Sequence, residues 1–210
     1  MKTGPLEAIV LAAGAGSRFG GGKLTAPWGE GLLLDAALDA AFAAPVRTVT
    51  VVWGADDKVL EAASRRADQV GEAARLHLLH NARHAEGMGA SLRTAIGSLP
   101  PDTAGAFVFL GDMPRIPHGI ARDLAEAMAA GARAAAPVCQ GRRGHPALFS
   151  AELFPALKAL AGDRGAGWLL GAMTHGLTLI PTDDDGVLFD VDEPQADAPR
   201  SPGSCQAEPD

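Results

Sequence analysis

A short loop that is rich in glycine and carries two cations follows the first apolar segment of the chain. Residues 11–23 read Leu-Ala-Ala-Gly-Ala-Gly-Ser-Arg-Phe-Gly-Gly-Gly-Lys. Glycines allow backbone N–H groups to approach an anion closely, and Arg18 and Lys23 add positive charge beside them. This composition predicts that the loop binds phosphate groups.

Two common phosphate-binding motifs do not fit this loop. A Walker loop would require glycine at Ser17 and a hydroxyl residue at Leu24. The dinucleotide-binding fingerprint Gly-x-Gly-x-x-Gly fails because one residue too many separates Gly16 from Gly20. The loop therefore needs a different explanation.

Carboxylates that could hold a metal ion occur in two later segments. Asp112 ends an apolar run in Leu-Gly-Asp-Met-Pro, where it could bind a metal or simply cap a turn. Asp190 and Asp192 lie in Leu-Phe-Asp-Val-Asp-Glu-Pro, residues 188–194. If this segment is a strand, the two side chains share one face, and the pattern does not choose between them.

The elements that must position these residues alternate between strands and helices. Such alternation predicts a mostly parallel sheet with helices on both faces and ligands bound beyond the carboxyl ends of the strands. The apolar runs predict strands over 6–12, 48–53, 76–79, 106–110 and 132–138, and helical patterns cover 31–44, 56–66, 90–98, 118–130, 151–160 and 165–173.

Length and composition restrict the class of protein. The 210 residues, 47% of them hydrophobic, predict one domain over 1–194, followed by a disordered tail at 195–210 that is rich in Ala, Pro and Ser. The net charge of -7 disfavours nucleic acid as a partner. No apolar stretch reaches the roughly 20 residues that cross a bilayer. We therefore expect a cytoplasmic protein without membrane partners.

Taken together, these motifs resemble one enzyme family. The sequence Leu-Ala-Ala-Gly-x-Gly-x-Arg-x-Gly followed by Lys23, the Gly-Asp-Met-Pro around Asp112 and the late acidic segment resemble the MobA-like nucleotidyltransferases. Within that family the similarity is greatest to the molybdenum cofactor cytidylyltransferases, and it extends from Ala8 to Pro194. The resemblance implies an α/β fold, namely the glycosyltransferase-A-like nucleotidyltransferase fold. This is a Rossmann-like three-layer α/β/α sandwich with a mixed, mostly parallel sheet.

The resemblance also assigns roles to residues. Arg18, Lys23 and Asp112 are expected to be catalytic, and Mg²⁺ is expected to be held by Asp112 and Asp190, with Asp192 as the alternative ligand. Glu193 and Gly167 depart from the family pattern, which usually has threonine and arginine there. The nucleotide site is expected to contain Leu11, Ala12, Ala13, Gly14, Gly16, Lys23, Gly89, Ser91 and Asp112.

Some of these residues also have simpler explanations. Ser91, in the segment expected to meet the base, could instead be the N-cap of the next helix. Arg143, His145 and Asp163 fall in two segments that resemble acceptor-binding parts of the cytidylyltransferase branch, although His145 could be only a turn residue before Pro146. The other histidines, His84 among them, lack the spacing of metal ligands and are expected to be structural or exposed.

The expected reaction is transfer of CMP from CTP to the phosphate of a molybdenum-bound pterin, with release of pyrophosphate. The product could then pass transiently to a molybdoenzyme or its chaperone. Guanylyl transfer to the same cofactor and nucleotidyl transfer to a sugar phosphate are the enzymatic alternatives. The Ala12-Ala13 pair favours cytidine, because the guanylyl branch usually has glycine at the second position. A nucleotide-binding regulator with the same fold is the non-enzymatic alternative.

Overall fold

The computed structural model describes residues 4–14, 21–54, 56–162 and 164–192. Three predicted site residues, Gly16, Arg18 and Asp163, lie outside the described residues, as does the expected tail at 195–210. Within the described part of the chain, no helix is long and apolar enough to cross a membrane.

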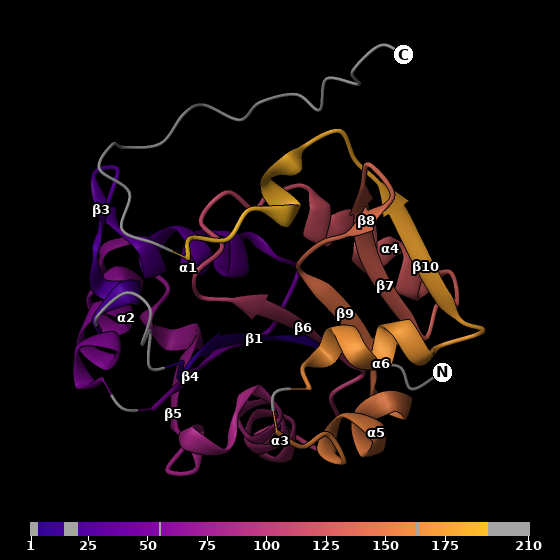
Figure 1. The fold of residues 1–210 in the computed structure, drawn as a ribbon, viewed down its shortest axis with the longest axis horizontal. Helices are drawn as coiled ribbons and strands as arrows, with labels where there is room; N and C mark the ends of the chain where they lie inside the picture. Colours follow the sequence, from indigo (N-terminus) through magenta and orange to yellow (C-terminus); the bar gives the residue numbers. More distant parts are fainter. Residues whose placement is uncertain (1–3, 15–20, 55, 163, 193–210) are drawn as a thin grey trace.

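One large mixed sheet forms the centre of the molecule (Figure 1). Its main strands run in the order β10-β7-β9-β6-β1-β4-β5, and β8 pairs with β7. All neighbours among β6, β1, β4 and β5 are parallel, whereas β9 is antiparallel to both β6 and β7. The strands are β1 (Leu6–Ala12), β4 (Val49–Trp53), β5 (Leu76–His80), β6 (Gly105–Leu110), β7 (Ala134–Cys139), β8 (Arg142–Arg143), β9 (Ala147–Ser150) and β10 (Leu177–Pro181).

Helices cover both faces of this sheet. Alternate residues of β1 point to opposite faces: Ala8 and Val10 pack in the apolar cluster that includes α1, α2 and α4, whereas Ile9 packs with α3, α5 and α6. Figure 1 shows α3, α5 and α6 along the lower side of the sheet. The predicted three-layer α/β/α sandwich is therefore confirmed. The helices are α1 (Leu33–Ala43), α2 (Asp57–Gln69), α3 (Met88–Ser98), α4 (Ile120–Ala129), α5 (Phe154–Lys158) and α6 (Ala166–Ala172).

Several elements differ from the sequence prediction. The strands β8, β9 and β10 were not predicted, because β8 and β9 are very short and β10 is a half-exposed edge strand. The predicted helix at 151–160 is a 3₁₀ turn, Ala151–Leu153, followed by the short α5. The predicted helix at 31–44 starts later, because β3 (Gly31–Leu32) pairs with β2 (Pro27–Trp28) in a small hairpin.

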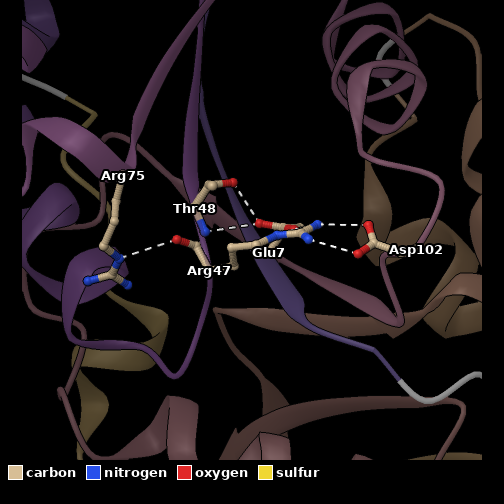
Figure 2. Close-up of polar contacts among 5 residues, drawn as sticks. All are labelled: Glu7, Arg47, Thr48, Arg75 and Asp102. Atoms are coloured by element: carbon tan, nitrogen blue, oxygen red, sulfur yellow. Dashed lines mark hydrogen bonds and ion pairs between the residues drawn. The ribbon is translucent and has the colours of Figure 1, made fainter.

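A polar network ties the amino-terminal edge of the sheet together (Figure 2). Glu7 of β1 is fully buried and accepts hydrogen bonds from Arg47 Nε at 2.7 Å and from the Thr48 N–H and hydroxyl at 3.0 and 2.6 Å. Arg47 also donates to Asp102 at 2.9 and 3.1 Å, and its carbonyl accepts from Arg75. This network holds the start of β1 against the segments that precede β4 and β6, at the edge opposite the carboxyl ends of the strands.

Candidate active site

A cavity of about 570 Å³ lies at the carboxyl ends of β1 and β6. This is the sheet edge at which ligands bind in open α/β folds. The cavity collects residues from the end of β1, the turn at Lys23, the segment before α3 and the end of β6. Its lining residues are Leu11, Ala12, Ala13, Gly14, Lys23, Leu24, His84, Ala85, Gly87, Met88, Ser91, Leu110 and Asp112.

Lys23 is positioned by a turn that glycine makes possible. Gly22 has φ of 66°, a left-handed conformation that disfavours residues with a side chain. The carbonyl of Gly22 accepts hydrogen bonds from the Thr25 N–H and hydroxyl, both at 3.1 Å. Leu24 is buried in the core beside this turn. The turn and its apolar anchor hold the start of the Lys23 side chain at the cavity wall.

Asp112 is positioned by the close approach of β6 to β1. The Gly111 N–H donates to the Leu11 carbonyl at 3.0 Å, and a Cβ on Gly111 would lie 3.2 Å from that oxygen. Glycine therefore lets the backbone of β6 follow β1 to its end, so that Asp112 emerges beside Lys23. The Lys23 ammonium donates to Asp112 Oδ2 at 2.8 Å.

The late acidic segment reaches the same place. The Val191 N–H donates to the Asp112 carbonyl at 3.1 Å, and Val191 is buried. Asp192 Oδ1 consequently lies 3.6 Å from the Lys23 ammonium. Asp190 is exposed, and its side chain makes no hydrogen bond or ion pair with another described residue. The structure thus brings together Lys23, Asp112 and Asp192, the alternative carboxylate.

Residues 189–192 do not form the strand on which Asp190 and Asp192 would share a face. After the short 3₁₀ helix Asp185–Leu188, residues 189–192 have no regular structure. Phe189 packs between Trp28, at 6.0 Å between ring centroids, and Arg115, whose guanidinium carbon lies 4.7 Å from the Phe189 ring centroid. These side-chain contacts and the Val191 hydrogen bond replace strand pairing in holding the segment.

Ser91 lines the cavity from inside α3, which corrects its alternative explanation as an N-cap. The N-cap is Gly87, so Ser91 lies one turn into the helix. Its hydroxyl oxygen accepts a hydrogen bond from the buried Asn81 amide at 2.9 Å. Because that oxygen accepts from Asn81, the Ser91 O–H can donate into the cavity.

Gly89 has a packing role rather than a place in the cavity lining. Its N–H donates to the Gly162 carbonyl at 2.9 Å, and a Cβ there would lie 3.0 Å from the same oxygen. Glycine therefore allows α3 to pack against the segment before α6. The expected contact of Gly89 with a nucleotide stays a prediction.

His84 and Met88 are lining residues that the sequence interpretation missed. His84 lies in the 3₁₀ turn His84–Glu86, which follows β5 and carries it to the cavity, and Met88 is the first residue of α3. A signal was present, because both belong to the 81–91 segment that was expected to meet the base. His84 was set aside because it lacks the spacing of a metal ligand, but that spacing does not indicate whether a histidine lines a cavity.

Two of the three predicted acceptor residues, Arg143 and His145, lie on and beside β8. Arg143 is exposed, and its guanidinium group lies close to Gly171 of α6. A Cβ atom added to Gly171 would lie 3.3 Å from a guanidinium nitrogen. The His145 N–H donates to the Val187 carbonyl at 2.8 Å. Burial lowers the pKa of the His145 imidazole to about 4, against the opposing effect of the Asp112 charge. His145 is therefore neutral at neutral pH, and its contact with an acceptor stays a prediction.

The partly buried His145 should make folding stability depend on pH. Its folded pKa of about 4 lies below the ordinary 6.5, so the unfolded chain binds more protons between these values. The stability present above pH 6.5 is lost as the pH falls towards 4. The free energy of unfolding, measured in urea, should fall between pH 7 and pH 5 in both proteins. The fall should be about 2 kcal/mol larger in the native protein than in His145→Gln. Equal losses in the two proteins would contradict this explanation.

The donor set at Lys23 fits a divalent metal ion. The carboxylates of Asp112 and Asp192 both face the Lys23 ammonium group. The ammonium group therefore occupies a position where both carboxylates could bind a cation. Mg²⁺ is commonly bound through one or two carboxylates, with substrate phosphates and water as its other ligands. The described residues contain no group of three His, Cys, Asp or Glu side chains able to hold a metal without such a substrate.

Comparison with known proteins identifies the family of this chain. The model of the MobA-like NTP transferase domain matches residues 8–177. Molybdenum cofactor cytidylyltransferase from Escherichia coli (strain K12) is 30% identical over 145 residues, which cover 69% of this chain and 70% of that protein.

Solved structures show the same fold. The Rv0371c homolog from Mycobacterium sp. strain JC1 superposes with a TM-score of 0.75 and 31% identity, covering 90% of each chain. Rv0371c from Mycobacterium tuberculosis H37Rv, solved as a complex with manganese, has a TM-score of 0.65 and 22% identity over 86% of this chain and 89% of that one. The chain therefore belongs to the MobA-like NTP transferase family.

Proposed function

We propose that this protein transfers CMP from CTP to the terminal phosphate of a molybdenum-bound pterin, releasing pyrophosphate. The observation that carries the proposal is the meeting of Lys23, Asp112 and Asp192 at a cavity whose wall is the end of β1. The resemblance to the cytidylyltransferase of E. coli supports the choice of substrates.

The cavity has separate regions that suit the parts of a nucleotide. The backbone at Ala13 and Gly14, together with Lys23, forms a wall suited to phosphates. Ser91, His84 and Met88 lie on other lining elements and would surround the base. Ala13 lines the cavity, and the guanylyl branch usually has glycine at this position, where a larger purine needs more room beside the strand. This favours CTP over GTP.

The chain's own groups suit a direct displacement at the α-phosphorus. A phosphate acceptor is already a nucleophile and needs no strong base, so catalysis consists of positioning and charge neutralisation. Lys23 would bind phosphate oxygens and stabilise the charge that builds on the leaving pyrophosphate. Arg18, which lies outside the described residues, is proposed to share this role.

Asp112 and Asp192 would hold the divalent ion. Bound there, Mg²⁺ would supply positive charge to the α-phosphate and to the leaving group. Asp192 replaces Asp190 in this proposal because it is the carboxylate near Lys23. The manganese in the related Rv0371c structure supports a divalent ion in proteins of this fold.

Replacing Ser91 with alanine should weaken CTP binding. We expect KM for CTP to rise about tenfold, the effect of one lost hydrogen bond, with little change in kcat. The matched control is Ser98→Ala at the far end of α3, where the hydroxyl donates to the Ala95 carbonyl and to no other described residue. Steady-state pyrophosphate release measures both constants. An unchanged KM in Ser91→Ala would remove Ser91 from the nucleotide site.

The choice of nucleotide is tested by pyrophosphate release with Mg²⁺, the pterin acceptor and each of CTP, GTP, ATP and UTP in turn. Release with CTP supports the proposal. Release with GTP alone would assign the protein to guanylyl transfer. If no triphosphate reacts with the pterin, sugar phosphates should replace it as acceptors, and tight CTP binding with no turnover on either acceptor would indicate a regulator.

A further inference from the structure

The ammonium group of Lys23 occupies the position of a cation between two carboxylates. It lies 2.8 Å from Asp112 Oδ2 and 3.6 Å from Asp192 Oδ1. The Lys23 side chain is only 12% exposed, whereas Asp112 and Asp192 are 29% and 59% exposed. The least exposed member of the cluster is thus the positive charge that the two negative charges share.

A charge count shows that this cluster is nearly balanced without a metal ion. Two carboxylates and one ammonium carry a net charge of -1. Adding a divalent ion while Lys23 stays in place would give +1, with two cations crowded against the same oxygens. A triphosphate supplies the missing negative charge, because its oxygens can accept hydrogen bonds from Lys23 while the carboxylates hold the metal ion.

We propose that Lys23 couples metal binding to nucleotide binding by serving as the internal cation of the metal site. Lys23 holds Asp112 and Asp192 together and opposes a metal ion that arrives alone. A triphosphate draws the ammonium away and thereby opens the carboxylates to the ion. This inference rests on the metal and triphosphate sites of the proposed function, but not on which base or acceptor is used.

The geometry of Lys23 allows this exchange. Lys23 lines the same cavity as Ala13, Gly14 and Asp112, so the expected phosphate wall and a carboxylate partner of Lys23 belong to one cavity. A lysine has a flexible four-carbon stem with an ammonium that can rotate to new acceptors. The backbone around it is fixed by the Gly22 turn and buried Leu24. Only the side chain has to move.

The direct test measures Mn²⁺ binding by electron paramagnetic resonance with no nucleotide present. Lys23→Met should bind Mn²⁺ at least about fivefold more tightly than the native protein, in the usual range of coupling between sites. This direction is unusual, because the same substitution should abolish nucleotidyl transfer. Lys58→Met removes an exposed cation from α2 and should leave Mn²⁺ affinity unchanged. The double variant Lys23→Met/Asp192→Asn should lose the gain.

Salt separates direct competition from a general effect of charge. Long-range attraction of Mn²⁺ is screened at high ionic strength, whereas competition for the same oxygens is not. The ratio between Lys23→Met and native affinity should therefore persist in high salt. A ratio that collapses to one would overturn the proposal, as would equal or weaker Mn²⁺ binding by Lys23→Met.

A second measurement uses the native protein and does not depend on folding of a variant. Acetylation of Lys23, followed by peptide mass spectrometry, should be slow without ligand and faster with saturating Mn²⁺, which displaces the ammonium from Asp112. Adding CTP together with Mn²⁺ should protect it again. A rate unaffected by Mn²⁺ would overturn the proposal. Neither measurement needs the acceptor, so failure of cytidylyl transfer would be seen separately, in the pyrophosphate assay.

Discussion

An Asp112→Asn variant is expected to release pyrophosphate at least about a thousandfold more slowly than the native protein, because several kcal/mol of charge stabilisation depend on this carboxylate. Asparagine keeps the size of the side chain and can still accept a hydrogen bond from Lys23, which donates to Asp112 at 2.8 Å. The variant should therefore fold normally. Initial rates at saturating CTP and Mg²⁺ measure the effect.

The two late aspartates provide a matched comparison for this prediction. Asp192→Asn should lower the rate by at least about a hundredfold, since Asp192 lies 3.6 Å from Lys23. Asp190→Asn removes the same charge from an exposed position two residues earlier and should change the rate by less than about threefold. The reverse order of effects would restore Asp190 as the metal ligand and contradict the arrangement described above.

A Glu7→Ala variant is expected to lose about 3 kcal/mol of folding stability. Glu7 is fully buried and accepts hydrogen bonds from Arg47 and from both the N–H and the hydroxyl of Thr48. Its removal leaves these donors without their acceptor at the start of β1. Urea unfolding followed by circular dichroism measures the loss, which should appear as a lower midpoint with an unchanged slope.

Asp102→Ala is the control for the same network. Asp102 pairs with the other side of Arg47 but is 60% exposed, so its loss should cost less than about 1 kcal/mol. Activity per folded molecule should be unchanged in both variants, because the network lies at the edge of the sheet opposite the cavity. Equal losses of folding stability in Glu7→Ala and Asp102→Ala would show that the burial of Glu7 does not determine how much stability it contributes.

The central part of the site could be predicted because its residues directly follow apolar strands. Leu11 and Ala12 end β1, Ala13 and Gly14 follow directly, and Asp112 comes two residues after β6 ends. Parallel neighbouring strands place their carboxyl ends at the same edge of the sheet. The sequence pattern therefore predicted that both lie at the ligand-binding edge of the sheet, and the family resemblance assigned the first loop and Asp112 to one site.

The choice between Asp190 and Asp192 depends on contacts that no local pattern contains. The segment is held by the Val191 hydrogen bond to the Asp112 carbonyl and by packing of Phe189 between Trp28 and Arg115. These partners are far away in the sequence. A period-two argument assumed a strand, and without the strand it could not identify which carboxylate reaches Lys23.

The late strands show a second limit of sequence patterns. β10 lies at the sheet edge with half-exposed residues, and β9 has only four residues between a turn and a 3₁₀ helix. Neither has the long apolar run that predicted β1 and β6. Their pairing with β7 and β6 is decided by the tertiary fold, as is the place of His84 in the cavity wall.

Transfer of label from CTP carrying ³²P at the α-phosphorus to the pterin acceptor tests the central claim most directly. The native protein should move the label to the acceptor in the presence of Mg²⁺, and Asp112→Asn should not. Guanylyl transfer alone, or tight CTP binding without any labelled acceptor, would contradict cytidylyl transfer at this site.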